Sequence, residues 1–186
     1  MLKRIVLGVV GVLGLGLVVI GGLAATKPAT FQVERSATLA ARPDAIYPNI
    51  EDFHRWAAWS PWEKLDPQMR KSYTGPERGT GAGYAWSGNS DVGQGRMSIT
   101  DARPNEQVTI RLEFIEPFAA TNETVYTLKP VAAGTEVTWS MNGPNSFAGK
   151  VMSVFVDMDK MIGNDFEEGL ANLKRVSETE AASATK

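Results

Sequence analysis

A continuous run of apolar residues and glycines near the start of the sequence sets the strongest limit on what this chain can become. Residues 5–25 contain no charged side chain over 21 positions. As a helix rising about 1.5 Å per residue, this run would be about 31 Å long, close to the thickness of a bilayer hydrocarbon core. We therefore expect a transmembrane anchor over residues 5–25.

The charges around this run predict its orientation. Lys3 and Arg4 precede it, whereas a single Lys27 follows, so the positive-inside rule places residues 1–4 in the cytoplasm and the rest of the chain on the extracytoplasmic (periplasmic or extracellular) side of the cell membrane. The alternative is a cleaved secretory signal ending near Ala24. We favour the anchor because an apolar signal core has only about 7–15 residues.

The composition of the chain excludes several kinds of site. There is no cysteine and only one histidine among 186 residues, so the common zinc sets and a cysteine nucleophile are excluded. The formal net charge of −2 provides no basic surface for nucleic acid. We expect no metal, no cofactor and no nucleic-acid partner, and we make no prediction of oligomeric state.

Beyond the apolar run, alternating apolar and polar residues predict strands. The first covers residues 31–40, and two short helices follow, one beginning at Pro43 and one running through residues 53–59. Glycine-rich and proline-rich turns then separate six further strands. These strands are expected at about 69–75, 82–87, 93–102, 106–116, 119–131 and 134–142.

The last long segment changes to helical spacing. Between residues 147 and 176, apolar side chains recur at steps of three and four, which predicts one long helix with a single apolar stripe. Gly163 and Gly169 weaken such a helix, so we expect them to permit close packing or a bend. The polar residues 177–186 predict a disordered tail.

Several motifs occur in an order that resembles a known family. They include Trp59-Ser60-Pro61-Trp62, Tyr84-x-Trp86 and Asp165-Phe166-Glu167. Residues 31–176 are similar to the polyketide-cyclase/dehydrase-like branch of the START-related (SRPBCC) superfamily. This resemblance implies an α+β helix-grip fold, in which a curved antiparallel sheet of about seven strands surrounds the long C-terminal helix and a deep apolar cavity lies between them.

The cavity defines the candidate binding residues. Trp56, Trp59 and Trp62 are three residues apart and could form a wall or lid, although packing between the short helices and the sheet is the simpler interpretation. The other expected lining residues are apolar or aromatic and come from the strands and the last helix. They are Tyr84, Trp86, Met97, Leu112, Phe114, Tyr126, Trp139, Met141, Phe155, Met158 and Ile162.

Polar candidates are few. His54 is the only side chain whose ordinary pKa suits proton transfer near neutral pH, and we regard it as a weak catalytic candidate beside charged neighbours. Around the turn between two central strands, one polar side chain could point inward as an anchor for a ligand. The candidates are Glu113, Glu116, Asn122 and Glu123, and the strand pattern does not choose among them.

These features favour a membrane-anchored domain that binds a lipid or another hydrophobic small molecule. A second interpretation is an enzyme of cyclase or dehydratase type that uses His54 or a carboxylate. A third is an interaction domain with a filled core. The fold alone does not choose among them, because one fold can carry many functions.

Overall fold

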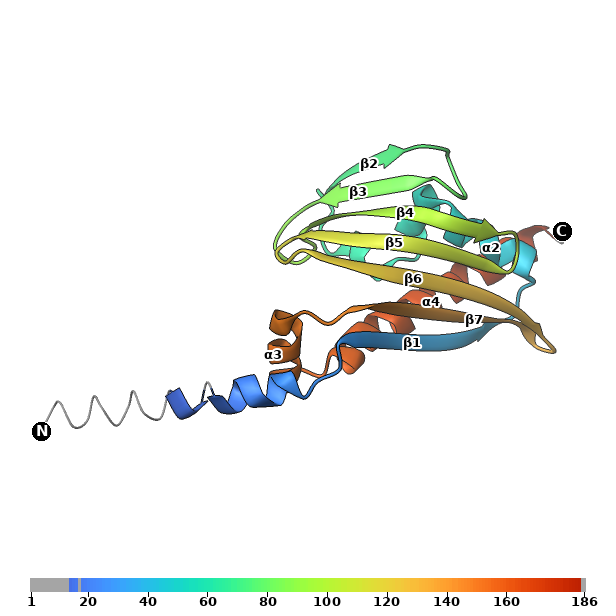
Figure 1. Cartoon of the computed structure of the whole chain (residues 1–186). Helices are drawn as coiled ribbons and strands as arrows, with labels where there is room; N and C mark the ends of the chain where they lie inside the picture. Colours follow the sequence, from blue (N-terminus) through green and yellow to red (C-terminus); the bar gives the residue numbers. More distant parts are fainter. Residues whose placement is uncertain (1–13, 17, 185–186) are drawn as a thin grey trace, which may run out of the picture.

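The computed structural model describes residues 14–16 and 18–184 (Figure 1). A helical segment that ends at residue 25 leads into one antiparallel sheet, whose concave face is covered by helices. The strands are β1 (Thr30–Leu39), β2 (Arg70–Thr74), β3 (Gly83–Ser87), β4 (Gln94–Arg103), β5 (Gln107–Glu116), β6 (Ala120–Val131) and β7 (Gly134–Pro144). The helices are α2 (Pro43–Glu51), the 3-10 helices η1 (Phe53–Ala58) and η2 (Pro61–Lys64), α3 (Phe147–Phe155) and α4 (Met158–Ala184).

The sheet is a series of hairpins closed by its first strand. Its order is β1-β7-β6-β5-β4-β3-β2, and every neighbouring pair is antiparallel. The glycine-rich and proline-rich turns therefore act as the hairpin connections that their spacing predicts. The seven-stranded sheet and the long C-terminal helix confirm the α+β helix-grip architecture.

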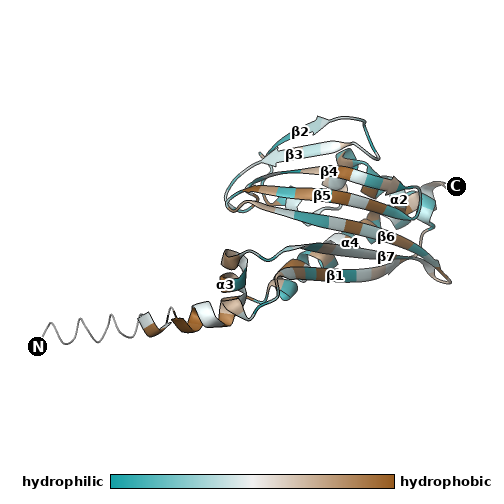
Figure 2. Ribbon diagram, viewed as in Figure 1, coloured by the Kyte–Doolittle hydropathy of each residue, from teal (hydrophilic) through white to brown (hydrophobic). Residues whose placement is uncertain are grey.

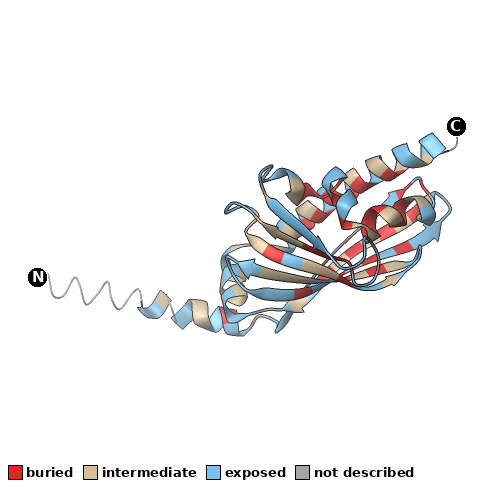
Figure 3. Cartoon of the chain, turned by 90° about the horizontal axis from the view of Figure 1, so that it is seen from above, coloured by how far each residue is buried: buried red, intermediate tan, exposed pale blue. Residues whose placement is uncertain are grey.

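Helix α4 supplies the cover of the concave face (Figure 3). Its apolar stripe buries Phe166, Leu170 and Leu173 against the sheet. A Cβ atom at Gly169 would lie 2.7 Å from the ring of Trp139, so only glycine allows the helix to approach this closely. The expectation of close packing at Gly169 is confirmed.

The predicted single helix is divided in two. Val156 adopts an extended conformation (φ −125°, ψ 131°), and the Asp157 side chain then accepts a hydrogen bond from the backbone N–H of Lys160 at 3.0 Å. Asp157 thus caps a new helix, α4, at its N-terminus. The apolar spacing continues across this break, so periodicity alone did not reveal it.

Helix α4 also extends beyond its predicted end. It continues to Ala184, whereas the composition predicts disorder from residue 177. The reason is that this last part packs on the domain: Ser177 is fully buried, and its Oγ lies 3.3 Å from the donating Nδ2 of Asn49. The Glu178 carboxylate accepts a hydrogen bond from the backbone N–H of Ala40 at 2.6 Å.

The N-terminal apolar run is only partly visible. Within residues 14–16 and 18–184, no helix has both the length and the apolar character needed to cross a membrane. Residues 5–13 and 17 of the expected anchor lie outside the described residues. The anchor and its orientation therefore remain predictions.

Candidate functional site

The sheet register brings the expected lining residues onto one face. All eight that come from strands lie on the concave side, because each sits at the alternating position that faces α4. Tyr84 pairs with Met97, Met97 with Leu112, and Tyr126 with Trp139. The expected residues of β3 to β7 thus share one face, and their role as the lining of a cavity stays a prediction.

The half of this face that lies beneath α4 is filled by stacked aromatic rings. Trp139 lies parallel to Phe166 with ring centroids 4.0 Å apart, and Trp59 packs edge-on against Trp139 at 5.8 Å. Trp59 is fully buried, and its indole N–H donates to the Asn49 carbonyl at 2.8 Å. Trp56 is buried in the same cluster, so Trp56 and Trp59 perform the packing role.

The other half of the concave face is more open. Trp86, Met97, Leu112 and Phe114 are only half-buried there, as are three more of the expected lining residues, Trp62 of η2 and Met158 and Ile162 of α4. Phe155 is not part of this surface, because its side chain is 67% exposed on α3. The helix break at Val156 explains the difference, since it turns α3 away from the stripe that α4 continues.

Four buried polar atoms on the concave face have no hydrogen-bond partner among the described residues. They are Asn122 Oδ1, Thr124 Oγ1 and Tyr126 OH on β6, and Trp139 Nε1 on β7. Each of these residues is at most 6% exposed. A buried polar group without a partner costs about 1–3 kcal/mol, so four of them on one face require an explanation.

The remaining aromatic side chains show how unusual this arrangement is for the chain. The indole N–H of Trp56 donates to the Ile50 carbonyl at 3.1 Å, and that of Trp86 to the Val92 carbonyl at 2.9 Å. The hydroxyl of Tyr84 donates to Glu63 at 2.8 Å. Elsewhere the chain supplies partners for its buried aromatic polar groups, but at Tyr126 and Trp139 it does not.

The structure also chooses among the four polar candidates of the β5–β6 region. Asn122 faces inward, next to Gly143, where a Cβ atom would meet its amide. Glu113 lies on the opposite face, between Arg96 and Arg111, and these guanidinium groups lower the pKa of its carboxyl. Sequence analysis missed Thr124, although its position two residues from both Asn122 and Tyr126 placed it on the same face.

The two buried tyrosines of this face are neutral near pH 7. Burial raises the pKa of Tyr126 well above its ordinary value. Burial also raises the pKa of Tyr84, and the hydrogen bond to Glu63 adds to that shift. The unpartnered polar groups therefore offer neutral donors and acceptors, which suits an uncharged polar group on a ligand. The charge of Arg35, which pairs with Trp139 across the sheet, is already matched by Asp159 and Glu167 of α4.

His54 lies apart from this surface. Its ring stacks on Tyr73 at the β2 edge of the sheet, with centroids 4.0 Å apart, and its Nδ1 lies 2.9 Å from Asp52 Oδ1. The side chain is 47% exposed. Over the described parts of the chain, no cluster of three metal-ligating side chains occurs.

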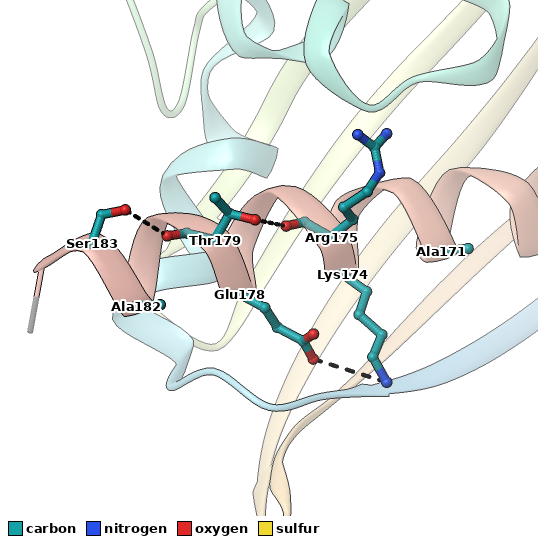
Figure 4. Close-up of a pocket in the computed structure, with 7 residues that line it drawn as sticks. All are labelled: Ala171, Lys174, Arg175, Glu178, Thr179, Ala182 and Ser183. Carbon is teal, nitrogen blue, oxygen red and sulfur yellow. Dashed lines mark hydrogen bonds and ion pairs between the residues drawn. The ribbon is translucent and has the colours of Figure 1, made fainter.

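Two depressions on the surface lie elsewhere. The larger, about 620 Å³, follows the outer side of α4, where Lys174 and Glu178 form an ion pair at 3.9 Å (Figure 4). The smaller, about 390 Å³, lies at the β5–β6 turn and reaches Pro144. Neither lies between the sheet and α4, so the expected deep cavity remains a prediction.

A curved antiparallel sheet that grips a long C-terminal helix defines the helix-grip class of domains. A family model described as polyketide cyclase / dehydrase and lipid transport matches residues 30–178. The chain therefore belongs to this family, and the resemblance seen in its motifs is confirmed. A search of curated proteins found no match.

Solved structures share the fold at low sequence identity. CV1439 from Chromobacterium violaceum is 17% identical, with a TM-score of 0.56 over 81% of this chain and 99% of its own. The Aha1 dimer from Colwellia psychrerythraea is 16% identical, with a TM-score of 0.56 over 80% of this chain and 96% of its own. SA2116 from Staphylococcus aureus, a protein of unknown function, is 12% identical, with a TM-score of 0.57 over 84% of this chain and 97% of its own. At such identities these matches establish the fold alone.

Proposed function

We propose that this protein is a membrane-attached binding domain that holds a lipid or another hydrophobic small molecule between the concave face of the sheet and α4. The observation that carries this proposal is the set of four unpartnered polar atoms on a concave face lined mainly by apolar and aromatic side chains. Binding sites for apolar molecules have this composition: mostly hydrophobic walls and a few polar groups that fix orientation.

The chemistry of the four groups suggests what the ligand presents. Trp139 Nε1 can only donate, Asn122 Oδ1 can only accept, and the hydroxyls of Thr124 and Tyr126 can do either. A hydroxyl or carbonyl on an apolar body would satisfy them, whereas a charged headgroup would find no counter-ion among them. We therefore expect a neutral or weakly polar ligand.

The half-buried residues indicate where such a ligand would begin to bind. Trp86 and Phe114 lie edge-to-face, with ring centroids 6.1 Å apart, at the open end of the concave face. A Cβ atom at Gly95 would lie 2.4 Å from the Trp86 ring, so glycine lets that ring lie across β4. This provides an apolar floor from which the polar row on β6 leads inward.

The test is native mass spectrometry, followed by solvent extraction, on residues 26–186 after gentle purification. The matched structures cover nearly all of their own chains, so the fold requires no equivalent of the N-terminal run. We expect a co-purifying apolar molecule that is reduced at least tenfold in the Thr124→Val/Tyr126→Phe double variant. Thr127→Val, on the same strand but exposed on the other face, is the matched control and should retain the molecule.

A filled-core interaction domain is the alternative supported by a specific observation, the close stacking of Trp139 on Phe166. It predicts a clean ligand-free mass that persists after incubation with a lipid mixture. That result would overturn the binding proposal. A cyclase or dehydratase activity would instead use His54, which lies at the sheet edge away from the polar row, or a carboxylate.

A further inference from the structure

Exposed apolar side chains gather at one end of the molecule. Outside the N-terminal segment, six of the nine exposed large apolar residues that the structure describes lie in α3, at the start of α4, at the end of β5 or in the β5–β6 turn. Phe118 is 73% exposed, Phe155 67% and Phe147 65%. We call this surface the apolar end; its residues are Ile115, Phe118, Phe147, Met152, Phe155 and Met161.

The sheet topology places these segments together. Strand β7 ends at Pro144, immediately before α3, and β6 runs antiparallel to β7, so the β5–β6 turn lies at the same end. The depression shared by Ala119, Ala120 and Pro144 shows that the two segments are neighbours. The apolar end is therefore one surface built from separate parts of the chain.

The N-terminal apolar segment leaves the domain at this same end (Figure 1). Asn145, just before α3, donates from its backbone N–H to the Ala29 carbonyl at 2.8 Å and from its Nδ2 to the Pro28 carbonyl at 3.3 Å. Ala24 is fully buried, so the end of the helical segment packs on the domain. Figure 2 shows the hydrophobic colouring of this segment beside α3.

We propose that the apolar end docks on a lipid bilayer, with Phe118 and the α3 side chains inserted among the lipids. A lipid bilayer is the expected partner because an apolar run of 21 residues, long enough to enter a bilayer, adjoins this surface. Nine of these residues precede the described part of the chain. Helix α3 carries only Lys150 as a charge and residues 115–119 only Glu116, while the first turn of α4 adds Asp159 and Lys160, which have opposite signs. Docking is therefore apolar and should not need anionic lipid.

Docking at this end would join the bilayer to the proposed binding surface. Phe114 lies at the end of β5 that leads into the β5–β6 turn, and its partner across the ladder is Ala120 at the start of β6. The open half of the concave face thus faces the same way as the apolar end. A ligand could then pass between the bilayer and the domain without crossing water. This consequence of docking rests on the proposed function, because it assumes that the concave face binds a ligand.

The chain has no cysteine, so single labels can be placed without altering native thiols. The full-length chain is reconstituted into phosphatidylcholine vesicles as Phe118→Cys, Met152→Cys and Val131→Cys variants, each carrying an environment-sensitive fluorophore. Val131, 37% exposed, is the last residue of β6 at the opposite end and is the matched control. A lipid-borne quencher reports insertion, and vesicle flotation reports attachment of the chain separately.

We expect blue-shifted emission and at least a fivefold greater lipid quenching at positions 118 and 152 than at 131. Equal, weak quenching at all three positions would overturn docking. Blue-shifted emission without lipid quenching would also overturn it, because residues 5–13 or a second copy of the chain would then cover the surface. Ligand retention in the mass-spectrometry experiment is independent of these labels, so failure of docking and failure of the binding proposal are distinguishable.

Discussion

The two buried tyrosines of the concave face allow a sharp test of the unpartnered polar groups. Tyr84 and Tyr126 are at most 5% exposed, but only the hydroxyl of Tyr84 has a partner, Glu63. The same change, tyrosine to phenylalanine, should therefore have opposite effects at the two positions. At Tyr84 it removes a hydrogen bond to a carboxylate whose side chain is 8% exposed, which should cost about 1.5–3 kcal/mol.

At Tyr126 the change removes no hydrogen bond to any residue that the structure describes. In the ligand-free domain, Tyr126→Phe should cost no stability and should gain up to about 1–3 kcal/mol if the hydroxyl is dry. For a domain of this size, each 1 kcal/mol corresponds to about 2–4 °C in Tm. The assay is urea unfolding of ligand-free residues 26–186, monitored by tryptophan fluorescence, with the wild type and both variants measured in parallel.

The refuting outcome is a loss of more than about 1 kcal/mol in Tyr126→Phe, because such a loss would mean that the hydroxyl already makes a strong hydrogen bond in the free protein. With ligand bound, the sign should reverse. Tyr126→Phe should then lose part of the stabilisation that ligand gives the wild type, since stabilisation by a ligand follows its affinity for the folded state.

Three further changes test the packing around the site. Gly169→Ala should destabilise the fold by about 1–3 kcal/mol, although alanine has the better helix propensity, because the added Cβ atom would lie 2.7 Å from the Trp139 ring. A variant that is more stable than the wild type in urea unfolding would contradict this packing. Arg35 lowers the pKa of Asp159, so this ion pair stabilises the fold at pH values above the ordinary carboxyl pKa of 3.8, and the stabilisation is lost as pH falls through the lower pKa of the folded state. In Asp159→Asn, the unfolding midpoint should therefore fall less steeply at acidic pH than in the wild type. An equally steep fall would refute this linkage. Removal of residues 177–186 should lower Tm by several degrees, at about 2–4 °C for each 1 kcal/mol lost, because it deletes the buried Ser177. An unchanged Tm would show that this end of α4 adds nothing to the stability of the fold.

Much of the fold could be predicted because one-sided burial leaves a strong period-two signal. The hairpin turns fixed the strands to within a few residues, and alternation assigned Leu112, Phe114 and Trp139 to the correct face. The helix break at Val156 could not be predicted, because it depends on one capping side chain, Asp157, inside an unbroken apolar pattern. A single capping side chain can start a new helix within a continuous apolar pattern, and the spacing of the apolar residues does not show where this happens.

The inward polar residues were harder to predict for a different reason. Threonine and asparagine in a strand are as compatible with a solvated face as with a buried one, so Thr124 gave no signal of its own. Asn122 remained one of four candidates until the register placed it above Gly143. The signal that could have placed both was their even spacing from Tyr126, a residue expected to face inward, because residues two and four apart in a strand share one face.

The energetic cost of the polar row argues for an occupant in solution. Four buried groups at about 1–3 kcal/mol each would consume a large share of the about 5–15 kcal/mol by which a domain is usually stable. A folded chain cannot easily carry all four unsatisfied, so water or a polar group of a ligand must reach Asn122, Thr124, Tyr126 and Trp139. Access is least obstructed from the half-buried end of the concave face, where the half-buried Leu112 pairs with Asn122, the first residue of the row. The same polar row that lowers the stability of the free domain would therefore give a bound molecule its affinity.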